Sequence, residues 1–493
     1  SAKGGDGYYY GSGGGGRIAI YYDSLSLPTA NIIASGGRST YFTTYDNRYP
    51  QYNGGAGTVY LKNKAAQYGD LIINNNGIST YSTTTISGGT YASLTVKGGA
   101  IIAMNGNITT TQQDLVLDNI QLTVSGTLTT PGNLTLNSSQ IIVSSAMTIP
   151  GSLTLTKSGL TVTDSLTVAN AITLNDNSVL SHTGTTTTTQ SRLDIQATTI
   201  TIDATSKIDV TGKGYLGGWQ DGNSATYAGR TNGNTTTGGS IHSNGGSYGG
   251  LGGSSPWHGS GMNAVYGDLT NPAELGSGGA GTYYSSYEKG GSGGGLVRIG
   301  ATTLTLDGKI IADGAGTGAP NYWSSGGGSG GGIRIEVGAL TGTGTISAKG
   351  GDGYYYGSGG GGRITIYYDI LSLPVANVIA SGGKSAYFTT YDNRYPQYNG
   401  GAGTAYLKNK AAQYGDLIIN NNGISTYSTT TIASGTYANL TVKGGAIIAM
   451  NGNITTTQQN LVLDNIQLTV SGTLTTPGNL TLNSSQIIVS SAM

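Results

Sequence analysis

The sequence predicts an all-β protein: a parallel β-helix (β-solenoid) with Gly/Tyr-rich loop excursions, arranged in long tandem repeats. Residues 347–493 restate residues 1–147 at a constant offset of 346 without a gap, and only 11 of the 147 paired positions differ. Between Asp114 and Asn170, apolar residues recur every 19 positions and alternate with Thr, Ser or Asn. This alternation is the period-two pattern of half-buried strands.

The regular part consists of three consecutive segments, DLVLDNIQLTVSGTLTTPG, NLTLNSSQIIVSSAMTIPG and SLTLTKSGLTVTDSLTVAN. Three short strands joined by polar turns in each segment describe one rung of a solenoid. Equivalent apolar residues of successive rungs are expected to stack in columns. The predicted columns are Leu115, Leu134, Leu153 and Ile172; Leu117, Leu136, Leu155 and Leu174; Leu122, Ile141, Leu160 and Val179; Val124, Val143 and Val162; and Leu128, Met147 and Leu166.

Glycine-rich stretches lead directly into strand-like segments of similar form. Glycine contributes 87 of 493 residues, whereas about 7% is usual. The segments GSGGGGRIAI, GGSGGGLVRI, GGGSGGGIRI and GSGGGGRITI end at Ile20, Ile299, Ile335 and Ile366. We interpret them as rungs that carry Gly-rich excursions, since glycine permits close backbone approach. Packing of the excursions as polyglycine II helices is an open alternative.

These patterns predict five regions. Residues 1–64 are Gly/Tyr-rich decorated rungs of repeat A, 65–211 are regular rungs, and 212–295 form one large Gly-rich excursion. Residues 296–410 are decorated rungs, with repeat B beginning at 347, and 411–493 are regular rungs of an incomplete repeat. Because terminal solenoid repeats need caps, we expect the protein to be longer than this sequence.

Composition narrows the function classes. The chain has 23 basic and 23 acidic residues, and only 9% of its residues are charged. It therefore lacks the basic surface that nucleic acids require, and no apolar run approaches the roughly 20 residues of a membrane span. The absence of cysteine removes disulfide and thiolate chemistry. An uncharged surface favours packing against copies of the same protein, so self-association is the expected partnership.

Tyrosine is the abundant aromatic residue, with 34 Tyr against 2 Phe. Candidate contact residues are the triads Tyr8, Tyr9, Tyr10 and Tyr354, Tyr355, Tyr356, together with Trp219 and Trp257 in the large excursion. Their flat apolar faces with polar tips suit packing within or between subunits, and equally the stacking of surface glycans.

No catalytic constellation is apparent. The only glutamates are Glu274, Glu288 and Glu336, and no carboxylates cluster as polysaccharide-cleaving sites require. We therefore expect no enzymatic activity and no cofactor. Four aspartates in Gly-rich turns are minor candidates for calcium, although local hydrogen bonds within turns are their commoner role. They are Asp6, Asp307, Asp313 and Asp352.

The 19-residue rungs and the repeated GSGGGGRI strands at Gly11–Ile18 and Gly357–Ile364 resemble the β-solenoid stalks of giant tandem-repeat bacterial surface adhesins, of the filamentous haemagglutinin type. The resemblance implies secretion, display at the cell surface, and a structural or adhesive role. Our first hypothesis is a subunit of an extracellular fibre, filament or sheath. The alternative is an adhesin stalk that binds glycans or surfaces through residues 212–295, and a polysaccharide-active enzyme is a distant third.

Overall fold

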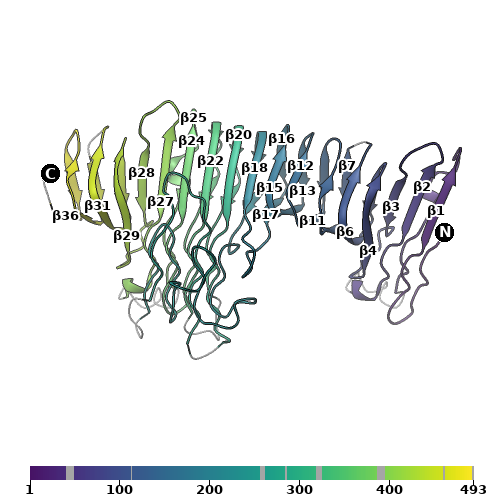
Figure 1. The fold of residues 1–493 in the computed structure, drawn as a ribbon, viewed down its shortest axis with the longest axis horizontal. Helices are drawn as coiled ribbons and strands as arrows, with labels where there is room; N and C mark the ends of the chain where they lie inside the picture. Colours follow the sequence, from purple (N-terminus) through teal and green to yellow (C-terminus); the bar gives the residue numbers. More distant parts are fainter. Residues whose placement is uncertain are drawn as a thin grey trace. The chain divides into compact units, whose positions relative to one another are not determined.

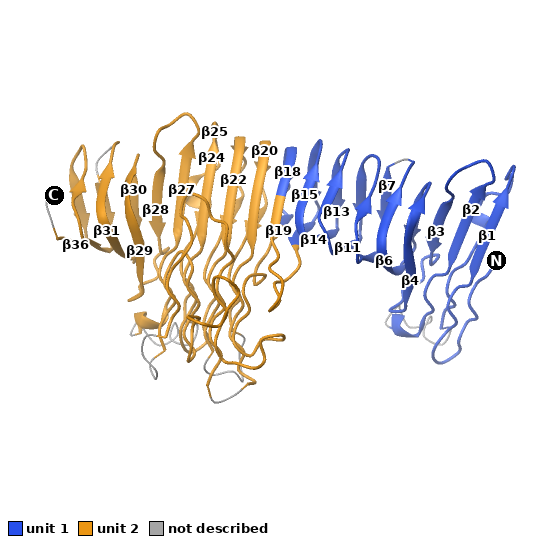
Figure 2. Cartoon of the chain, in the orientation of Figure 1, with its two compact units in different colours: residues 1–181, 195–207 blue, residues 182–194, 208–493 orange. Residues whose placement is uncertain are grey.

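The computed structural model describes residues 1–39, 49–112, 114–255, 261–283, 286–317, 325–385, 395–458 and 461–490. The fold is an all-β parallel β-helix, as the sequence predicts. It divides into two compact units (Figure 2): unit 1 comprises residues 1–181 and 195–207, and unit 2 comprises residues 182–194 and 208–493. Within each unit, short strands stack side by side as successive rungs (Figure 1).

The strands are short, and equivalent strands of the two repeats have equivalent bounds. In residues 1–209 they are β1 (Arg17–Tyr22), β2 (Thr58–Asn63), β3 (Asp70–Asn74), β4 (Thr83–Tyr91), β5 (Leu94–Lys97), β6 (Ile101–Thr110), β7 (Leu115–Asp118), β8 (Gln121–Val124), β9 (Leu128–Thr129), β10 (Leu134–Asn137), β11 (Gln140–Val143), β12 (Met147–Ile149), β13 (Leu153–Thr156), β14 (Gly159–Val162), β15 (Asp164–Val168), β16 (Ala171–Asn175), β17 (Val179–His182), β18 (Leu193–Ile202) and β19 (Lys207–Asp209). In residues 296–489 they are β20 (Leu296–Leu306), β21 (Lys309–Ile311), β22 (Gly332–Thr341), β23 (Thr345–Ser347), β24 (Arg363–Tyr368), β25 (Ile370–Leu371), β26 (Val378–Ile379), β27 (Thr404–Asn409), β28 (Asp416–Asn420), β29 (Thr429–Tyr437), β30 (Leu440–Lys443), β31 (Ile447–Thr456), β32 (Leu461–Asp464), β33 (Gln467–Val470), β34 (Leu474–Thr475), β35 (Leu480–Asn483) and β36 (Gln486–Val489). Short 3-10 turns are η1 (Thr29–Asn31), η3 (Pro50–Tyr52), η4 (Val375–Asn377) and η6 (Pro396–Tyr398).

The predicted apolar columns form the core of the regular rungs. Strands β7, β10, β13 and β16 are parallel, and Leu134 lies opposite both Leu115 and Leu153. Leu136 lies between Leu117 and Leu155 in the same way, and its side chain is 0% exposed. Residues between these positions point outward and are polar or exposed. The alternation read from the sequence therefore distinguishes the two faces of each strand correctly.

One assignment in the predicted columns is wrong, that of Val179. Val179 was expected above Leu160, but the amide N–H of Val179 donates to the carbonyl of Ser158, just as that of Gly159 donates to Ser139 one rung earlier. Leu180 thus takes the core position and is 0% exposed, whereas Val179 is only partly buried. This rung contains one extra residue, and a one-residue shift exchanges the two faces of a strand.

A ladder of buried serines marks one corner of the regular rungs in unit 1. The hydroxyl of each serine accepts the amide N–H of the preceding rung at N–O distances of 3.0 to 3.3 Å. The serines are Ser139, Ser158, Ser178 and Ser206. Where the chain leaves one strand and bends into the next, these hydroxyls satisfy amides that would otherwise be buried without a partner.

Each repeat departs from parallel stacking at one point. Strands β2 and β3 are antiparallel, with Val59 opposite Ile72, and β27 and β28 repeat this arrangement. Parallel neighbours need a crossover of about a dozen residues or more, and only residues 64–69 join β2 to β3. The connection is too short for another rung, so the chain reverses. The reversal lies within residues 65–211, which the sequence analysis assigns to regular rungs, and no apolar pattern in the sequence signalled it.

Candidate functional site

Gly-rich segments pack against one another at one side of the strands of unit 2 (Figure 1). Six consecutive amides of residues 326–331 donate to three neighbouring segments in turn, at N–O distances of 2.7 to 3.0 Å. Gly326 and Ser329 donate to Ala280 and Ser277; Gly327 and Gly330 donate to Gly357 and Gly360; Gly328 and Gly331 donate to Ala315 and Ala312. A period of three is that of a left-handed extended helix without internal hydrogen bonds. The structure therefore favours the polyglycine II alternative for the excursions, while the strands they enter are solenoid rungs.

These packed Gly-rich segments of unit 2, which we call the glycine bundle, require glycine because their neighbouring backbones are too close for any side chain. A Cβ atom placed on Gly328 would lie 2.1 Å from the carbonyl oxygen of Ser292, and one on Gly330 would lie 2.1 Å from that of Ala348. Such contacts are well inside van der Waals distance, and backbone atoms cannot rotate away as a side chain could. The high glycine content is thus a packing requirement of these segments.

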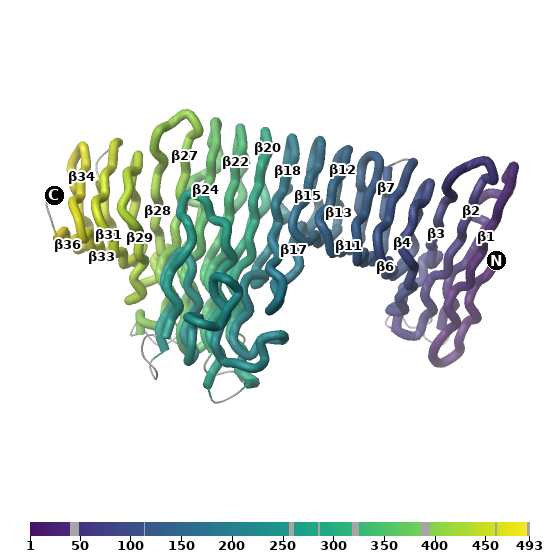
Figure 3. Tube along the Cα trace, viewed as in Figure 1, coloured from purple at the N-terminus to yellow at the C-terminus, as the bar shows by residue number. Residues whose placement is uncertain are grey.

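Residues 244–255, which we call the docking segment, cross the boundary between repeats. They belong to the first 346-residue repeat but pack on rungs of repeat B, which begins at residue 347. Figure 3 shows the teal excursion among the green rungs. Seven hydrogen bonds join the docking segment to these rungs: one of 3.1 Å from the Ser254 hydroxyl to the carbonyl of Gln397, and six of 2.7 to 2.9 Å. Gly250, Gly253 and Ser254 donate amides to the carbonyls of Gly361, Ser358 and Gln397; Gly360 and Gly401 donate to Gly246 and Leu251; and the Ser428 hydroxyl donates to Gly252.

Arg363 is the charged centre of this interface and is only 5% exposed. Its Nε donates to the carbonyl of Tyr266 at 2.9 Å, and its guanidinium lies 5.6 Å from the ring centre of Tyr248. Burial lowers the pKa of Arg363 from its ordinary value. We call Arg363, together with Ser358, Gly360, Gly361, Gln397, Gly401 and Ser428, the acceptor surface. The sequence signal for Arg363 was present: an arginine follows the glycine run in both repeats, at Arg17 and Arg363.

The matched pair Arg363 and Arg17 tests this contact. We expect Arg363→Ala to lower the local free energy of unfolding by about 2–3 kcal/mol, because a buried charged hydrogen bond and a cation–π contact are lost together. Arg17→Ala, at an exposed position, should change it by less than about 0.5 kcal/mol. Hydrogen exchange measures the effect at residues 244–255 for Arg363→Ala and at residues 12–22 for Arg17→Ala, and equal effects of the two variants would contradict the assignment.

Asn263 organises the excursion from inside, a role that no pattern in the sequence signalled. It is 2% exposed. Its Oδ1 accepts the Ser247 amide at 2.7 Å and the Ser240 hydroxyl at 2.9 Å. Its Nδ2 lies 2.9 Å from the carbonyl of Ser247 and 3.1 Å from the hydroxyl of Ser277. A buried amide satisfied on both sides fixes the path of the surrounding chain.

The candidate tyrosines lie against one another. Tyr8, Tyr9 and Tyr10 are 64%, 50% and 68% exposed; the rings of Tyr8 and Tyr9 are 4.6 Å apart, and those of Tyr10 and Tyr52 are 5.5 Å apart. The second triad, Tyr354, Tyr355 and Tyr356, repeats this arrangement with Tyr398. Trp219 donates its Nε1 hydrogen to the carbonyl of Thr282 at 2.7 Å, and Trp257 lies outside the described residues. Both interpretations of these aromatics remain predictions.

The four aspartates join successive rungs, which corrects their assignment to local turns. Each carboxylate accepts an amide from a residue 32 to 36 positions later: Asp6 from Arg38, Asp307 from Thr343, Asp313 from Lys349 and Asp352 from Lys384. Only Asp6 adds a local contact, with Lys3 at 3.1 Å. Hydrogen bonding to Arg38 and Lys3 lowers the pKa of Asp6, whereas burial raises that of Asp313. Among the described residues, no three His, Asp or Glu side chains converge as metal ligands.

His182 gives unit 2 a pH dependence. Burial lowers its pKa to about 4, and its Nδ1 lies 2.6 Å from the carbonyl of Thr183. Between pH 6.5 and 4 the unfolded chain therefore binds more protons than the folded chain, so stability falls as pH falls through this window and then levels off. The expected loss is about 3 kcal/mol.

Unfolding of the wild-type chain and of His182→Leu in urea between pH 7 and 4 measures this effect, and the variant should lose that part of the slope. Asp203 titrates in a separate window: burial raises its pKa, but hydrogen bonds from Asp176, Thr205 and Ser206 outweigh burial and bring it to about 2. Its contribution is lost only below about pH 4. A wild-type slope unchanged by His182→Leu would contradict the prediction.

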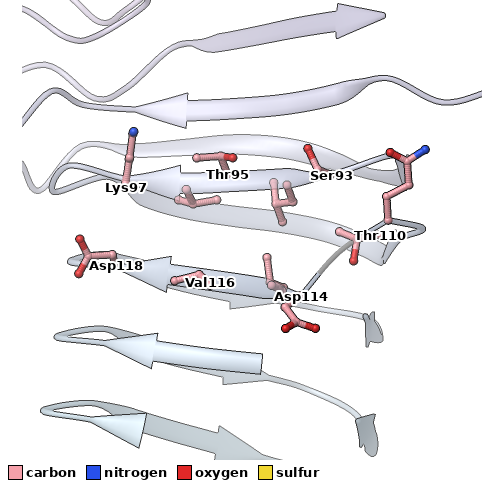
Figure 4. A pocket seen from close by; sticks show the side chains of 11 residues that line it. Ser93, Thr95, Lys97, Thr110, Asp114, Val116 and Asp118 are labelled. Atoms are coloured by element: carbon pink, nitrogen blue, oxygen red, sulfur yellow. The ribbon is translucent and has the colours of Figure 1, made fainter. Parts of the chain in front are cut away.

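A shallow groove lies on the regular rungs between β5 and β7 (Figure 4). The two strands pair only at Val96–Leu117 and Lys97–Asp118, so they diverge toward Ser93 and Asp114. The Asp114 carboxylate already accepts hydrogen bonds from Asn133, which lower its pKa. The groove thus follows from the change of rung length from 21 to 19 residues.

The docking segment, the acceptor surface and the aromatic clusters are therefore the features that carry functional information. The described residues include no helix with the length and apolar character needed to cross a membrane. Comparison with known proteins adds no further constraint: no family model, no curated protein and no solved structure matches the chain.

Proposed function

We propose that the protein is a structural subunit of an extracellular fibre, filament or sheath built from stacked β-solenoid repeats. The observation that carries the proposal is the continuity of the fold across the repeat boundary. Strand β22 pairs in parallel with β24, with Ile333 opposite Ile364, and the docking segment adds a second connection between the same two repeats. Within unit 2, the residues on the two sides of the repeat boundary are thus packed together without a linker between them.

This arrangement suits a load-bearing role. Force along the stack would be shared by parallel backbone ladders, by the apolar columns and by the glycine bundle. The outward positions of β8 are Gln121 and Thr123, and those of β10 are Thr135 and Asn137, so polar uncharged side chains cover much of the regular rungs. Such a surface has few charges to oppose side-by-side association. Secretion and display at a surface belong to the same proposal.

An adhesin stalk is the second candidate, supported by exposed aromatic residues. Tyr287 is 80% exposed and Tyr283 is 55% exposed, and Tyr283 lies 5.2 Å from Tyr227 in the excursion. Exposed aromatic faces suit sugar stacking. Against this candidate, residues 245–250 of the excursion are buried, so much of it is committed to internal packing.

Electron microscopy of the native material tests the proposal. Filaments containing several laterally associated chains support the structural function; single stalks with a distal head support the adhesin. Incubation with acidic polysaccharides addresses the enzyme alternative, for which released reducing ends or unsaturated sugars would be the positive result. Dispersed single particles without filaments would overturn the proposed function.

A further inference from the structure

The residues of the acceptor surface occur in both repeats of this chain, and the docking segment covers only those of repeat B. Every one of its residues has an identical counterpart in repeat A, at Ser12, Gly14, Gly15, Arg17, Gln51, Gly55 and Ser82. In repeat B the docking segment covers Ser358, Gly360 and Gly361, which are buried. In repeat A, Gly14 and Arg17 are exposed. The two surfaces have the same chemistry, and only one carries an occupant.

The backbone of repeat A presents matching unused groups. The amide N–H of Gly14 and the carbonyl of Gly15 form no hydrogen bond within the described part of the chain; their counterparts bond to Gly246 and Gly250. Gly55 is buried, yet its amide N–H also has no acceptor among the described residues, whereas that of Gly401 donates to Leu251 at 2.7 Å. A buried amide without a partner costs free energy.

Repeat A has glycine at two positions, Gly11 and Gly14, where the surrounding residues of this chain would leave room for a side chain. A Cβ atom on Gly14 would come no closer than 3.9 Å to another atom, and one on Gly11 would meet nothing within 4 Å. At the counterparts Gly360 and Gly357, a Cβ atom would lie 2.0 Å from the carbonyl oxygen of Gly250 and 2.2 Å from that of Gly253. The glycines fit the docking segment and nothing else near them.

We propose that Ser12, Gly14, Gly15, Arg17, Gln51, Gly55 and Ser82 of repeat A form a docking surface for a further, undocked copy of the excursion, whose residues 244–255 bind there as they do on repeat B. The inference rests on the proposed self-assembly and names the surfaces that meet. One contact is absent: the Thr365 hydroxyl donates to Leu269 at 2.7 Å, and repeat A has Ala19 there. That contact lies outside the docking segment, and each repeat B residue that bonds to the docking segment has an identical counterpart in repeat A.

The test adds a fluorescent peptide spanning residues 240–281, which contains the docking segment and Asn263, to the full 493-residue chain. We expect saturable binding, with slowed hydrogen exchange at residues 11–16 and 51–55. Gly14→Ala should weaken binding at least about tenfold, because its methyl group would overlap the docked backbone. Circular dichroism should show that its fold is unchanged. Gly184→Ala, another position with nothing within 4 Å, is the matched control and should bind normally.

Absence of saturable binding, or equal binding by the Gly14→Ala and wild-type chains, would overturn the docking proposal. The two proposals can fail separately. Native filaments seen together with no peptide binding would refute this interface and leave the structural function in place. Peptide binding at repeat A with native material that forms no filaments would support the interface and refute the fibre.

Discussion

Replacing Gly360 by alanine is expected to unfold the glycine bundle of unit 2 locally. The new methyl carbon would lie 2.0 Å from the carbonyl oxygen of Gly250 and 2.5 Å from its carbonyl carbon. Both atoms belong to backbone that is hydrogen-bonded on several sides, since the amide of Gly250 itself donates to Gly361. Relief requires the whole docking segment to move, so we expect a loss of more than about 3 kcal/mol.

Gly14→Ala is the control for this prediction, because Gly14 is the same residue of repeat A and has no atom closer than 3.9 Å to the new methyl group. Its effect should stay within about 0.5 kcal/mol. Hydrogen exchange at residues 244–255 and 357–363 in Gly360→Ala, and at residues 11–17 in Gly14→Ala, gives the local opening free energies. If both variants protected these amides as the wild-type chain does, the close packing of the bundle would be refuted.

The regular rungs could be predicted from the sequence because the burial of each side chain depends on its position within one short strand. The alternation of Leu115 and Leu117 with outward-facing residues determines which side of the strand is buried. The 19-residue spacing determines which residues of successive rungs stack on one another. The error at Val179 has the same origin: one inserted residue shifts the strand, and composition cannot tell Val179 from Leu180 when both are apolar. The β2–β3 hairpin was missed because a short connection matters only once both strands have been located.

The docking surfaces could not be predicted because they join residues far apart in the chain. Gly250 and Gly361 are separated by more than a hundred positions, and both lie in glycine runs with no register signal of their own. Likewise, an aspartate in a GGDG turn resembles a local turn residue; that Asp352 accepts the amide of Lys384 depends on the stacking of rungs. Side-chain pattern determines the columns, whereas backbone geometry determines the bundle.

Leu136→Ala is expected to produce the largest loss in the regular rungs. Leu136 is 0% exposed and lies between Leu117 and Leu155, one rung on each side. Its truncation leaves a cavity that stacked ladders on both sides cannot close without breaking their hydrogen bonds, so we expect about 3–5 kcal/mol. Because stability in a solenoid is a sum over neighbouring rungs, the measurement is the opening free energy of the amides in β7, β10 and β13 by hydrogen exchange.

Leu482 is the same residue in repeat B and provides the control for Leu136. It lies opposite Leu463 on one side but is 43% exposed in this chain, so Leu482→Ala removes contacts without enclosing a cavity. Its cost should be below about 1 kcal/mol, and it should be confined to β32 and β35. The comparison isolates the contribution of stacking, because residue type, strand and flanking sequence are the same and only the second neighbouring rung differs. Equal losses at the two positions would mean that each rung is stabilised from within, and the apolar columns would then not be what holds the solenoid together.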